Sequence, residues 1–237
     1  MTTIADNLHR VRARIEAACS AAGRPGASVV LLAVSKTFGA DAVRQAVHAG
    51  QRAFGENYLH EALLKMEQLR TPTPGSLQWH CIGPVQSNKT RLVAEHFDWL
   101  HTLDRERIAL RLSEQRPAHL APLQVCIQVN VDGGANKAGV APDEALALAH
   151  AVASLPGLQL RGVMSIPEPA PDYVSQLALH QRARAVFDVL RDADLPGAEH
   201  IDTLSLGMTA DLEAAIAAGS TMVRVGSGLF GTRPSKP

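Results

Sequence analysis

One lysine in this sequence stands where imine chemistry is favoured. Lys36 directly follows residues 29–35, an apolar run that predicts a buried strand. Partial desolvation at the end of such a strand favours the neutral amine, which can attack a carbonyl group and form an imine. A solvated lysine at a strand end has the same local pattern. The chemistry of Lys36 therefore depends on the residues that accompany it.

Two turns rich in glycine and serine predict an anion-binding site. Residues 205–209 read Ser-Leu-Gly-Met-Thr and precede a helical pattern, and residues 226–228 read Gly-Ser-Gly after an apolar run. Glycines allow the backbone to approach an anion, and free N–H groups together with hydroxyls bind phosphate. Either sequence alone could be an ordinary tight turn. The two together, each following a predicted strand, favour phosphate as the ligand.

An arginine lies inside the last apolar run. Arg224 stands between Val223 and Val225, and because alternate residues of a strand face opposite sides, it faces away from both valines. An arginine aimed into a barrel interior needs an acceptor, since burying an unpaired charge is costly. A pyridine nitrogen is one candidate, and arginine beside it would keep that nitrogen unprotonated and weaken the ring as an electron sink. An acidic side chain in a structural ion pair is the other candidate.

The elements that position these residues alternate regularly along the chain. Short apolar runs predict eight strands, and amphipathic patterns predict seven helices between them. A further helix is expected near the N-terminus, where Leu8, Val11 and Ile15 recur at helical spacing before Gly23 and Pro25. The strands are expected at residues 29–35, 52–55, 77–82, 99–103, 123–131, 159–166, 203–206 and 222–225. The intervening helices are expected at residues 41–49, 58–69, 89–96, 105–115, 142–155, 173–192 and 211–218.

Strict alternation of strands and helices implies parallel strands with right-handed crossovers. Eight such units close naturally into a (β/α)8 TIM-type barrel, and 237 residues suit one such domain over residues 1–237. A doubly wound open sheet is the main alternative, but residues 35–39 lack its Gly-rich loop. We therefore predict an α/β fold, a single barrel with an extra N-terminal helix. In this fold the loops after strands seven and eight usually bind phosphate.

Composition argues against several classes of function. Lys and Arg together number 23, as do Asp and Glu, so the zero net charge offers no basic field for non-specific nucleic-acid binding. The first ten residues lack the apolar segment of a signal peptide, and no run of about 18 apolar residues predicts a membrane span. Cys19, Cys81 and Cys126 form no CxxC pair, which argues against disulfides and zinc and suits a reducing cytoplasm. Cys81 and Cys126 lie in apolar runs, so we expect them to be buried structural thiols. The histidines show no metal-binding spacing.

Five stretches of the sequence together resemble the pyridoxal phosphate homeostasis proteins. They are residues 33–37, 54–58, 79–89, 200–209 and 222–227, and the likeness spans nearly the whole chain. It implies a barrel similar to the N-terminal domain of alanine racemase, with pyridoxal 5'-phosphate (PLP) as the cofactor. Two departures are small. Cys81 stands where the family usually has Phe or Met, and Ser227 replaces a threonine but keeps its hydroxyl.

The resemblance also implies roles for particular residues. Lys36 would hold PLP as a Schiff base, and Arg224 would lie near the ring nitrogen. The phosphate would contact Ser205, Gly226 and Ser227. We expect no catalytic residue and no metal. The full set of expected cofactor-binding residues is Lys36, Asn57, Ser205, Met208, Arg224, Gly226 and Ser227.

Three functions fit a lysine imine in this fold. The first is a monomeric PLP carrier that serves intracellular PLP homeostasis without turnover, with PLP-dependent apo-enzymes as candidate partners. The second is an amino-acid racemase, which needs a second acid/base group on the other face of the cofactor. Tyr58 and Tyr173 are the only tyrosines, and the chain ends six residues after Gly231, without the second domain of alanine racemases. The third is an aldolase-type lyase, whose lysine would more often lie on strand six, where residues 164–166 contain none.

Three further residues have less specific expected roles. Lys89 and Lys137 lie in loops on the same predicted face as Lys36, where they could steer an anionic cofactor or accept PLP during transfer. Solvated side chains explain both lysines as well. His80 neighbours Trp79 in a predicted strand, so only one of the two faces the barrel interior, and we expect a structural role for His80.

Overall fold

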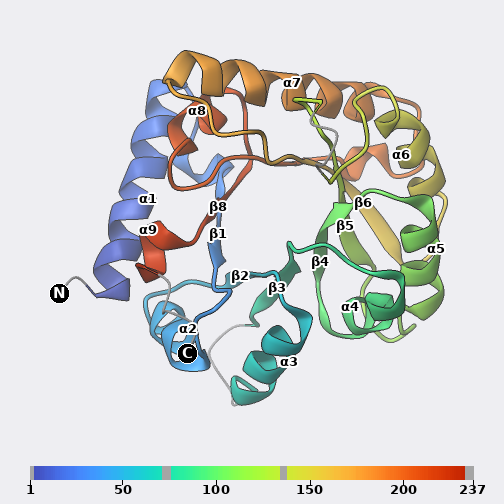
Figure 1. The fold of residues 1–237 in the computed structure, drawn as a ribbon, viewed down its shortest axis with the longest axis horizontal. Coiled ribbons are helices and arrows are strands. Elements are labelled where there is room, and N and C mark those ends of the chain that lie inside the picture. The colour runs from blue at the N-terminus through green and yellow to red at the C-terminus, as the bar shows by residue number, and fades with distance from the viewer. Residues whose placement is uncertain (1–2, 71–75, 134–137, 233–237) are drawn as a thin grey trace.

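A computed structural model describes residues 3–70, 76–133 and 138–232 of the chain. Within them, eight parallel strands close into a barrel in sequence order, with β1 beside β8 (Figure 1). This arrangement confirms the predicted (β/α)8 barrel and excludes the open doubly wound sheet. The strands are β1 (Val30–Val34), β2 (Ala53–Glu56), β3 (Gln78–Cys81), β4 (Trp99–Leu103), β5 (Leu123–Gln128), β6 (Leu158–Met164), β7 (Thr203–Ser205) and β8 (Met222–Val225).

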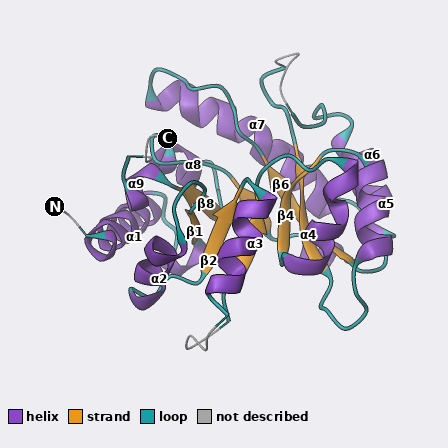
Figure 2. Ribbon diagram, turned by 60° about the horizontal axis from the view of Figure 1, so that its bottom comes forward, coloured by secondary structure: helices purple, strands orange, loops and turns teal. Residues whose placement is uncertain are grey.

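Helices surround the strands on the outside of the barrel (Figure 2). Short 3-10 turns at Gly26–Ser28, Ser87–Lys89 and Ala198–His200 join some of the elements. The helices are α1 (Ile4–Ala21), α2 (Ala40–His48), α3 (Leu59–Gln68), α4 (Thr90–His96), α5 (Glu106–Gln115), α6 (Ala145–Ala153), α7 (Tyr173–Asp192), α8 (Leu212–Ala217) and α9 (Ser227–Phe230).

Helix α1 forms because its sequence carries both a capping box and an apolar stripe. The Thr3 hydroxyl accepts from the backbone N–H of Asp6, and the Asp6 carboxylate accepts from the backbone N–H of Thr3. Leu8, Val11 and Ile15 are buried. The helix packs beside α8 and α9 (Figure 1), so the predicted N-terminal helix covers the last part of the barrel.

Several predicted boundaries shift at the carboxyl-terminal mouth of the barrel, and two of the changes follow β5 and β8. Strand β5 ends at Gln128 rather than at residue 131, and Val129 beyond it forms an isolated bridge to Val140. Residues 226–228, expected as a turn, instead lead into the short helix α9. Leu229 of this helix is fully buried, and burying it turns the chain back onto the barrel directly after β8.

Alternation along the strands separates the barrel interior from the layer beneath the helices. Two apolar clusters occupy the interior, one of Leu32, Val34, Ala53, Ile82 and Met222 and one of Trp99, Cys126 and Met164. Arg224 shares its strand face with Met222, as predicted, and Val223 and Val225 belong to the outer core. His80, His101 and Ser205 are also buried. The interior therefore carries polar groups that need internal partners.

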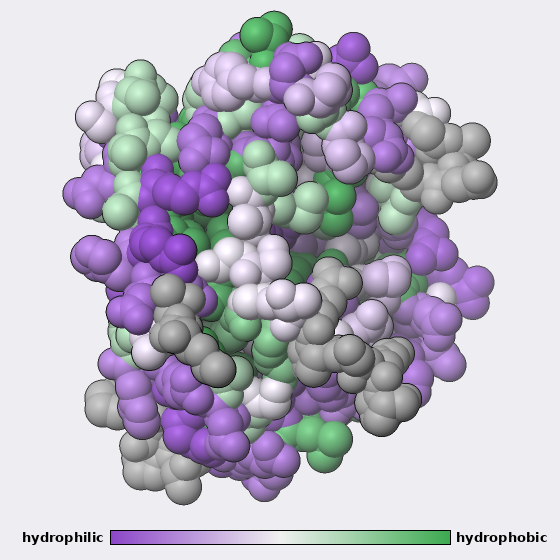
Figure 3. Space-filling view, turned by 60° about the vertical axis from the view of Figure 1, so that its left-hand side comes forward, coloured by the Kyte–Doolittle hydropathy of each residue, from purple (hydrophilic) through white to green (hydrophobic). Residues whose placement is uncertain are grey.

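The cysteines and the surface agree with the composition. Cys19, Cys81 and Cys126 are buried and free, and burial raises the pKa of Cys81 and Cys126 to about 12, so both thiols stay protonated. None of the helices in the described ranges is long and apolar enough to cross a membrane. Hydrophilic residues predominate on the face shown in Figure 3, where apolar residues form scattered patches.

Candidate functional site

A cavity of about 290 Å³ opens at the carboxyl-terminal ends of the strands. It brings together side chains from the two ends of the chain and from strands between them. Of the seven expected cofactor-binding residues, all but Ser205 line it. The lining residues are Val34, Lys36, Phe38, Asn57, Ile82, Ile166, Met208, Thr209, Ala210, Arg224, Gly226, Ser227 and Gly231.

A larger cavity, of about 540 Å³, opens at the opposite end of the barrel between α1 and the first three strands. Its two arginines, Arg12 and Arg52, donate hydrogen bonds to backbone carbonyls of the neighbouring α2–β2 connection. Those charges therefore serve the fold. The smaller cavity is the better candidate site because reactive and anion-binding groups converge there.

Lys36 lies two residues after the end of β1 and is half-buried. The next residue, Thr37, has a φ of +71°, in the left-handed region that β-branched residues rarely adopt. The backbone N–H of Thr37 donates to Glu61 Oε1 at 2.7 Å. The carbonyl of Ser35 accepts from Lys65 Nζ at 2.7 Å. Side chains of α3 thus hold the backbone on both sides of Lys36.

The same helix contributes to a buried charge cluster behind Lys36. Lys65 Nζ lies 2.6 Å from Glu56 Oε1 and 2.8 Å from Glu61 Oε1. The Ser35 hydroxyl donates to Glu56 Oε1 at 2.5 Å. Burial raises the pKa of Glu56, although Lys65 opposes that shift. Sequence reasoning missed this cluster, whose visible signal is the i, i+4 spacing of Glu61 and Lys65.

Arg224 reaches the cavity from inside the barrel. Its Nη1 donates to the carbonyl and hydroxyl oxygens of Ser205, at 2.6 and 2.7 Å, and its Nη2 donates to the Ser165 carbonyl at 2.9 Å. No ion pair joins Arg224 to a carboxylate of the described residues, so the structural ion pair considered for it is not seen. Burial lowers the pKa of Arg224 to about 10, and it remains charged at neutral pH.

The predicted phosphate contact of Ser205 stays a prediction, and the structure shows where its side chain lies. Its side chain is fully buried and lies outside the cavity lining, because Ser205 is the last residue of β7 and alternation turns it into the interior. The Ser205 hydroxyl instead accepts from Arg224 and lies 3.1 Å from His101 Nδ1. The structure thus assigns Ser205 to the support of Arg224.

Two buried histidines continue the hydrogen-bonded chain from Arg224 and Ser205 into the barrel interior. His101 Nε2 lies 2.9 Å from His80 Nδ1, and His80 stacks on Trp99. Burial lowers the pKa of His80 to about 3 and that of His101 well below 6.5, so both rings are neutral. His80 is buried and packed, in agreement with the structural role expected for it. Sequence reasoning missed His101, whose signal is a polar residue on the interior face of β4.

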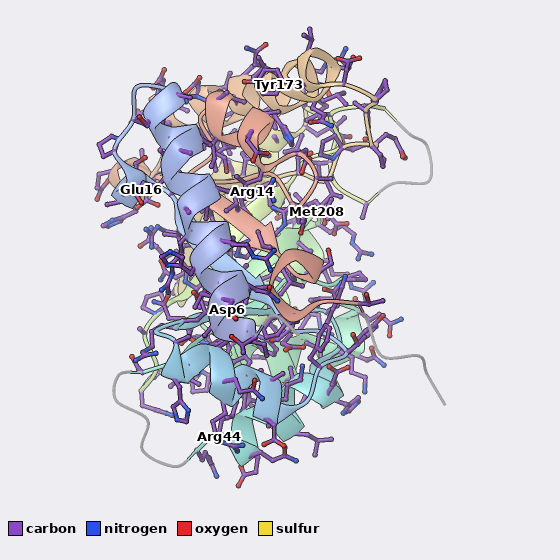
Figure 4. All side chains as sticks on the ribbon, turned by 90° about the vertical axis from the view of Figure 1, so that its left-hand side faces the viewer. Asp6, Arg14, Glu16, Arg44, Tyr173 and Met208 are labelled. Carbon is purple, nitrogen blue, oxygen red and sulfur yellow. The ribbon has the colours of Figure 1, made fainter. Side chains whose placement is uncertain are left out.

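The loops after β7 and β8 form one side of the cavity. The hydroxyls of Thr209 and Ser227 approach each other at 3.5 Å. Gly207 has a φ of +85°, and a Cβ there would meet the Ala215 Cβ at 2.4 Å, so this turn requires glycine. Arg14 of α1 donates to the Thr209 carbonyl and to Glu213, and Figure 4 shows it beside the loop that carries Met208. Helix α1 therefore fixes the loop.

Asn57 contributes hydrogen-bonding capacity that the protein does not use. It lines the cavity, and its buried Oδ1 has no hydrogen-bond partner among the described residues. Its backbone is fixed by close packing, since a Cβ on Gly83 would lie 2.3 Å from the Asn57 carbonyl oxygen. An amide held this way can bond to a polar group that enters the cavity.

The remaining predicted residues lie away from the cavity or outside the described residues. Tyr58 and Tyr173 are about half exposed and do not line it. Lys89 lies outside the lining, with its Nζ 3.2 Å from His60 Nε2. Lys137 lies outside the described residues. No group of three or more metal-ligating side chains occurs among the residues that the structure describes.

Comparisons with known proteins agree with this geometry. Residues 7–234 match the family described as "Alanine racemase, N-terminal domain". The chain is 57% identical over 233 residues to "Pyridoxal phosphate homeostasis protein" of Pseudomonas aeruginosa, covering 98% of this chain and 97% of that protein. It is 35% identical to PipY of Synechococcus elongatus PCC7942, solved with PLP bound, with a TM-score of 0.82 and coverage of 97% and 100%. Alanine racemase from Corynebacterium glutamicum, 20% identical with a TM-score of 0.64, shares the fold over 98% of this chain and 61% of that enzyme.

Proposed function

The chain belongs to the family of pyridoxal phosphate homeostasis proteins, which share the alanine racemase N-terminal domain, and we propose that it holds PLP on Lys36 as part of intracellular PLP homeostasis. The observation that carries this proposal is the convergence of Lys36, Arg224 and the Thr209 and Ser227 loops on one cavity. PipY, a relative of similar fold, is solved with PLP bound.

The residues present fit three of the polar groups of PLP: the aldehyde, the ring nitrogen and the phosphate. Lys36 supplies an amine for the aldehyde. The guanidinium of Arg224 has five N–H groups, and its three hydrogen bonds to Ser205 and Ser165 leave capacity for the ring nitrogen. Gly226, Ser227 and Thr209 supply backbone and hydroxyl groups for the phosphate. The unsatisfied amide of Asn57 offers a further polar contact, and Met208 provides an apolar one.

Lys36 would bind the cofactor covalently. Its Nζ is the amine that would hold the aldehyde carbon of PLP as a Schiff base, with the aldehyde oxygen lost as water. When bound, PLP would supply an electron sink. Arg224 would oppose that chemistry, because a guanidinium cannot give up a proton to the ring nitrogen and would keep it unprotonated.

The lining of the cavity supports a carrier more than a racemase. Racemisation needs acid/base groups on both faces of the cofactor. Among the described lining residues, none is Tyr, His, Cys, Asp or Glu. We therefore propose that Lys36 tethers PLP without catalytic turnover.

We further propose that the protein acts as a monomer of one domain, residues 1–237, in the cytoplasm, and that it passes PLP to apo-enzymes. Ile166 and Met208 at the cavity are each 41% exposed, so PLP held there would remain accessible from outside. A second, transient PLP site at Lys89 or Lys137 would assist such a transfer. Solvated side chains remain the simpler explanation for both.

A spectrum and a chemical trap test the tether. The protein incubated with PLP should show the visible absorbance of a lysine imine, and Lys36→Ala should abolish it. Lys89→Ala is the comparison variant, and because Lys89 lies outside the cavity lining, this variant should keep the imine absorbance that Lys36 gives. Borohydride reduction followed by mass spectrometry should place the pyridoxyl label on Lys36. A wild-type protein that takes up no PLP would refute the proposal, and label on Lys89 or Lys137 would establish a second site.

Two activity measurements separate carrier from enzyme. PLP-loaded protein mixed with a PLP-dependent apo-enzyme and a PLP scavenger should restore activity to the apo-enzyme. Incubation with L-alanine or L-serine should produce the D-enantiomer no faster than free PLP does. Faster racemisation would overturn the carrier proposal.

A further inference from the structure

The turn that follows Lys36 holds one residue in a strained backbone conformation. Thr37, at a φ of +71°, is the one non-glycine residue with positive φ in the part of the chain that the structure describes. Its Oγ1 is buried and has no hydrogen-bond partner among those residues, so the side chain does not compensate for the strain. Strain of this kind persists only where surrounding contacts enforce it, and it gathers at functional sites.

One ion pair on α3 enforces this conformation. Glu61 and Lys65 are one helical turn apart and 2.8 Å from each other. Lys65 holds the carbonyl of Ser35, and Glu61 holds the N–H of Thr37, each at 2.7 Å. The pair therefore spans Lys36, with one contact on the peptide before it and one on the peptide after it.

The ion pair is anchored deeply at one end. Lys65 is 3% exposed and also bonds to Glu56, which accepts from the Ser35 hydroxyl. Well-packed apolar residues would stabilise this position as well as or better than buried charges do. The buried charges of Lys65 and its two carboxylate partners therefore need another explanation. Their hydrogen bonds to the backbone at the end of β1 provide one.

We propose that Glu61 and Lys65 are positioning residues for Lys36, which keep Thr37 in its left-handed conformation and thereby aim the Lys36 side chain into the cavity. The proposal rests on the proposed function for the identity of the ligand that Lys36 binds. It adds that imine formation depends on two side chains that do not line the cavity.

A purely structural role for Glu61 makes different predictions. In that case its removal would lower the free energy of unfolding and leave PLP affinity unchanged in the folded protein. Under our proposal PLP affinity falls, and relief of the strain restores it. Because glycine adopts positive φ at no steric cost, Thr37→Gly supplies that relief without Glu61.

The experiment compares Glu61→Ala, Glu61→Gln, Thr37→Gly and the Glu61→Ala/Thr37→Gly double variant. Imine formation is titrated with PLP by absorbance, unfolding is followed in urea, and amide hydrogen exchange is measured at Thr37. Glu61→Ala should bind PLP about tenfold more weakly and should expose the Thr37 amide to exchange. Glu61→Gln keeps an acceptor oxygen for that amide and should stay within about threefold of wild type.

The double variant tests whether Glu61 acts on PLP affinity through the conformation of Thr37. Thr37→Gly should recover most of the PLP affinity that Glu61→Ala loses, whether or not it recovers stability. Unchanged affinity in Glu61→Ala, or no recovery in the double variant, would overturn the positioning role. Failure of the proposed function looks different, because wild-type protein would then form no imine. The exchange of the Thr37 amide would still show whether Glu61 holds the turn.

Discussion

Two walls of the cavity hold their key residues by different means. On the Lys36 wall, Lys65 and the carboxylates of Glu56 and Glu61 form a charge cluster that grips backbone groups. On the Arg224 wall, Ser205 and His101 form a chain of neutral groups that grips a side chain. Both walls are largely buried, so desolvation acts on both.

The difference follows from the charge that each wall presents to the cavity. Within the Lys36 wall, the ammonium of Lys65 lies within ion-pair distance of two carboxylates, those of Glu56 and Glu61. The Arg224 wall keeps its partners neutral, because burial, then His80, then Arg224 itself lower the pKa of His101. No carboxylate lies within ion-pair distance of Arg224 among the described residues. The positive charge of Arg224 is therefore free to act on whatever occupies the cavity.

Among changes measured at neutral pH, removal of the ammonium from the Lys36 wall should have the largest effect. Lys65→Met leaves the Glu56 carboxylate buried without its counter-charge, and the free energy of unfolding should fall by about 3–5 kcal/mol. Urea unfolding measures the loss. Addition of Glu56→Gln should restore much of it, because the uncompensated charge is then gone. If Lys65→Met is as stable as wild type, the ion pair between Lys65 and Glu56 does not stabilise this part of the protein.

A drop in pH should lower the free energy of unfolding through the histidines of the Arg224 wall. Both histidines titrate near 6.5 in the unfolded chain, whereas burial lowers the pKa of His80 to about 3 and that of His101 well below 6.5. The unfolded state therefore binds more protons below pH 6.5, and stability should fall as the pH drops from 6.5 toward 3. The slope should be roughly 1 kcal/mol per pH unit for each histidine. Urea unfolding at several pH values should give a shallower dependence in His80→Gln, and equal slopes would contradict this.

Loss of one hydroxyl from the Arg224 wall should have the smallest effect and the most specific one. Ser205→Ala removes an acceptor of Arg224 and should cost about 1–2 kcal/mol of stability. It should also shift the absorbance or the pH titration of the bound imine, because Arg224 is held less firmly. Ser220→Ala is the matched control, since its buried hydroxyl bonds only to the carbonyls of Leu204, Leu206 and Met222. A spectral change in both variants, or in neither, would contradict the idea that Ser205 acts on the imine by supporting Arg224.

Sequence pattern predicts the fold and the cavity where local periodicity decides the outcome. Strands end where apolar runs end, so Lys36 and the loop at Ser227 fall at the mouth, and the alternation of β8 turns Arg224 inward. The burial of Ser205 was not foreseen, because β7 is only three residues long and the sequence does not show whether its last residue belongs to the strand or to the loop.

The supporting residues are harder to predict because they act across the fold. His101 meets Ser205 from a strand 104 positions away, and that pairing depends on the register of the closed barrel. The pairing of Glu61 and Lys65 can be seen in the helical pattern of α3. The contact between Glu61 and the turn at Thr37 cannot be seen in the sequence, because the sequence does not reveal the positive φ of a threonine.

The closure of the barrel has a consequence for synthesis of the protein. Lys36 follows the first strand, Arg224 lies on the last, and the two strands are neighbours, with Leu32 opposite Arg224. The proposed PLP site therefore straddles the seam where the two ends of the chain meet. A nascent chain on the ribosome has no complete cavity until β8 has emerged. Covalent capture of PLP on Lys36 would therefore follow the emergence of β8, and a chain cut before β8 would not retain the cofactor.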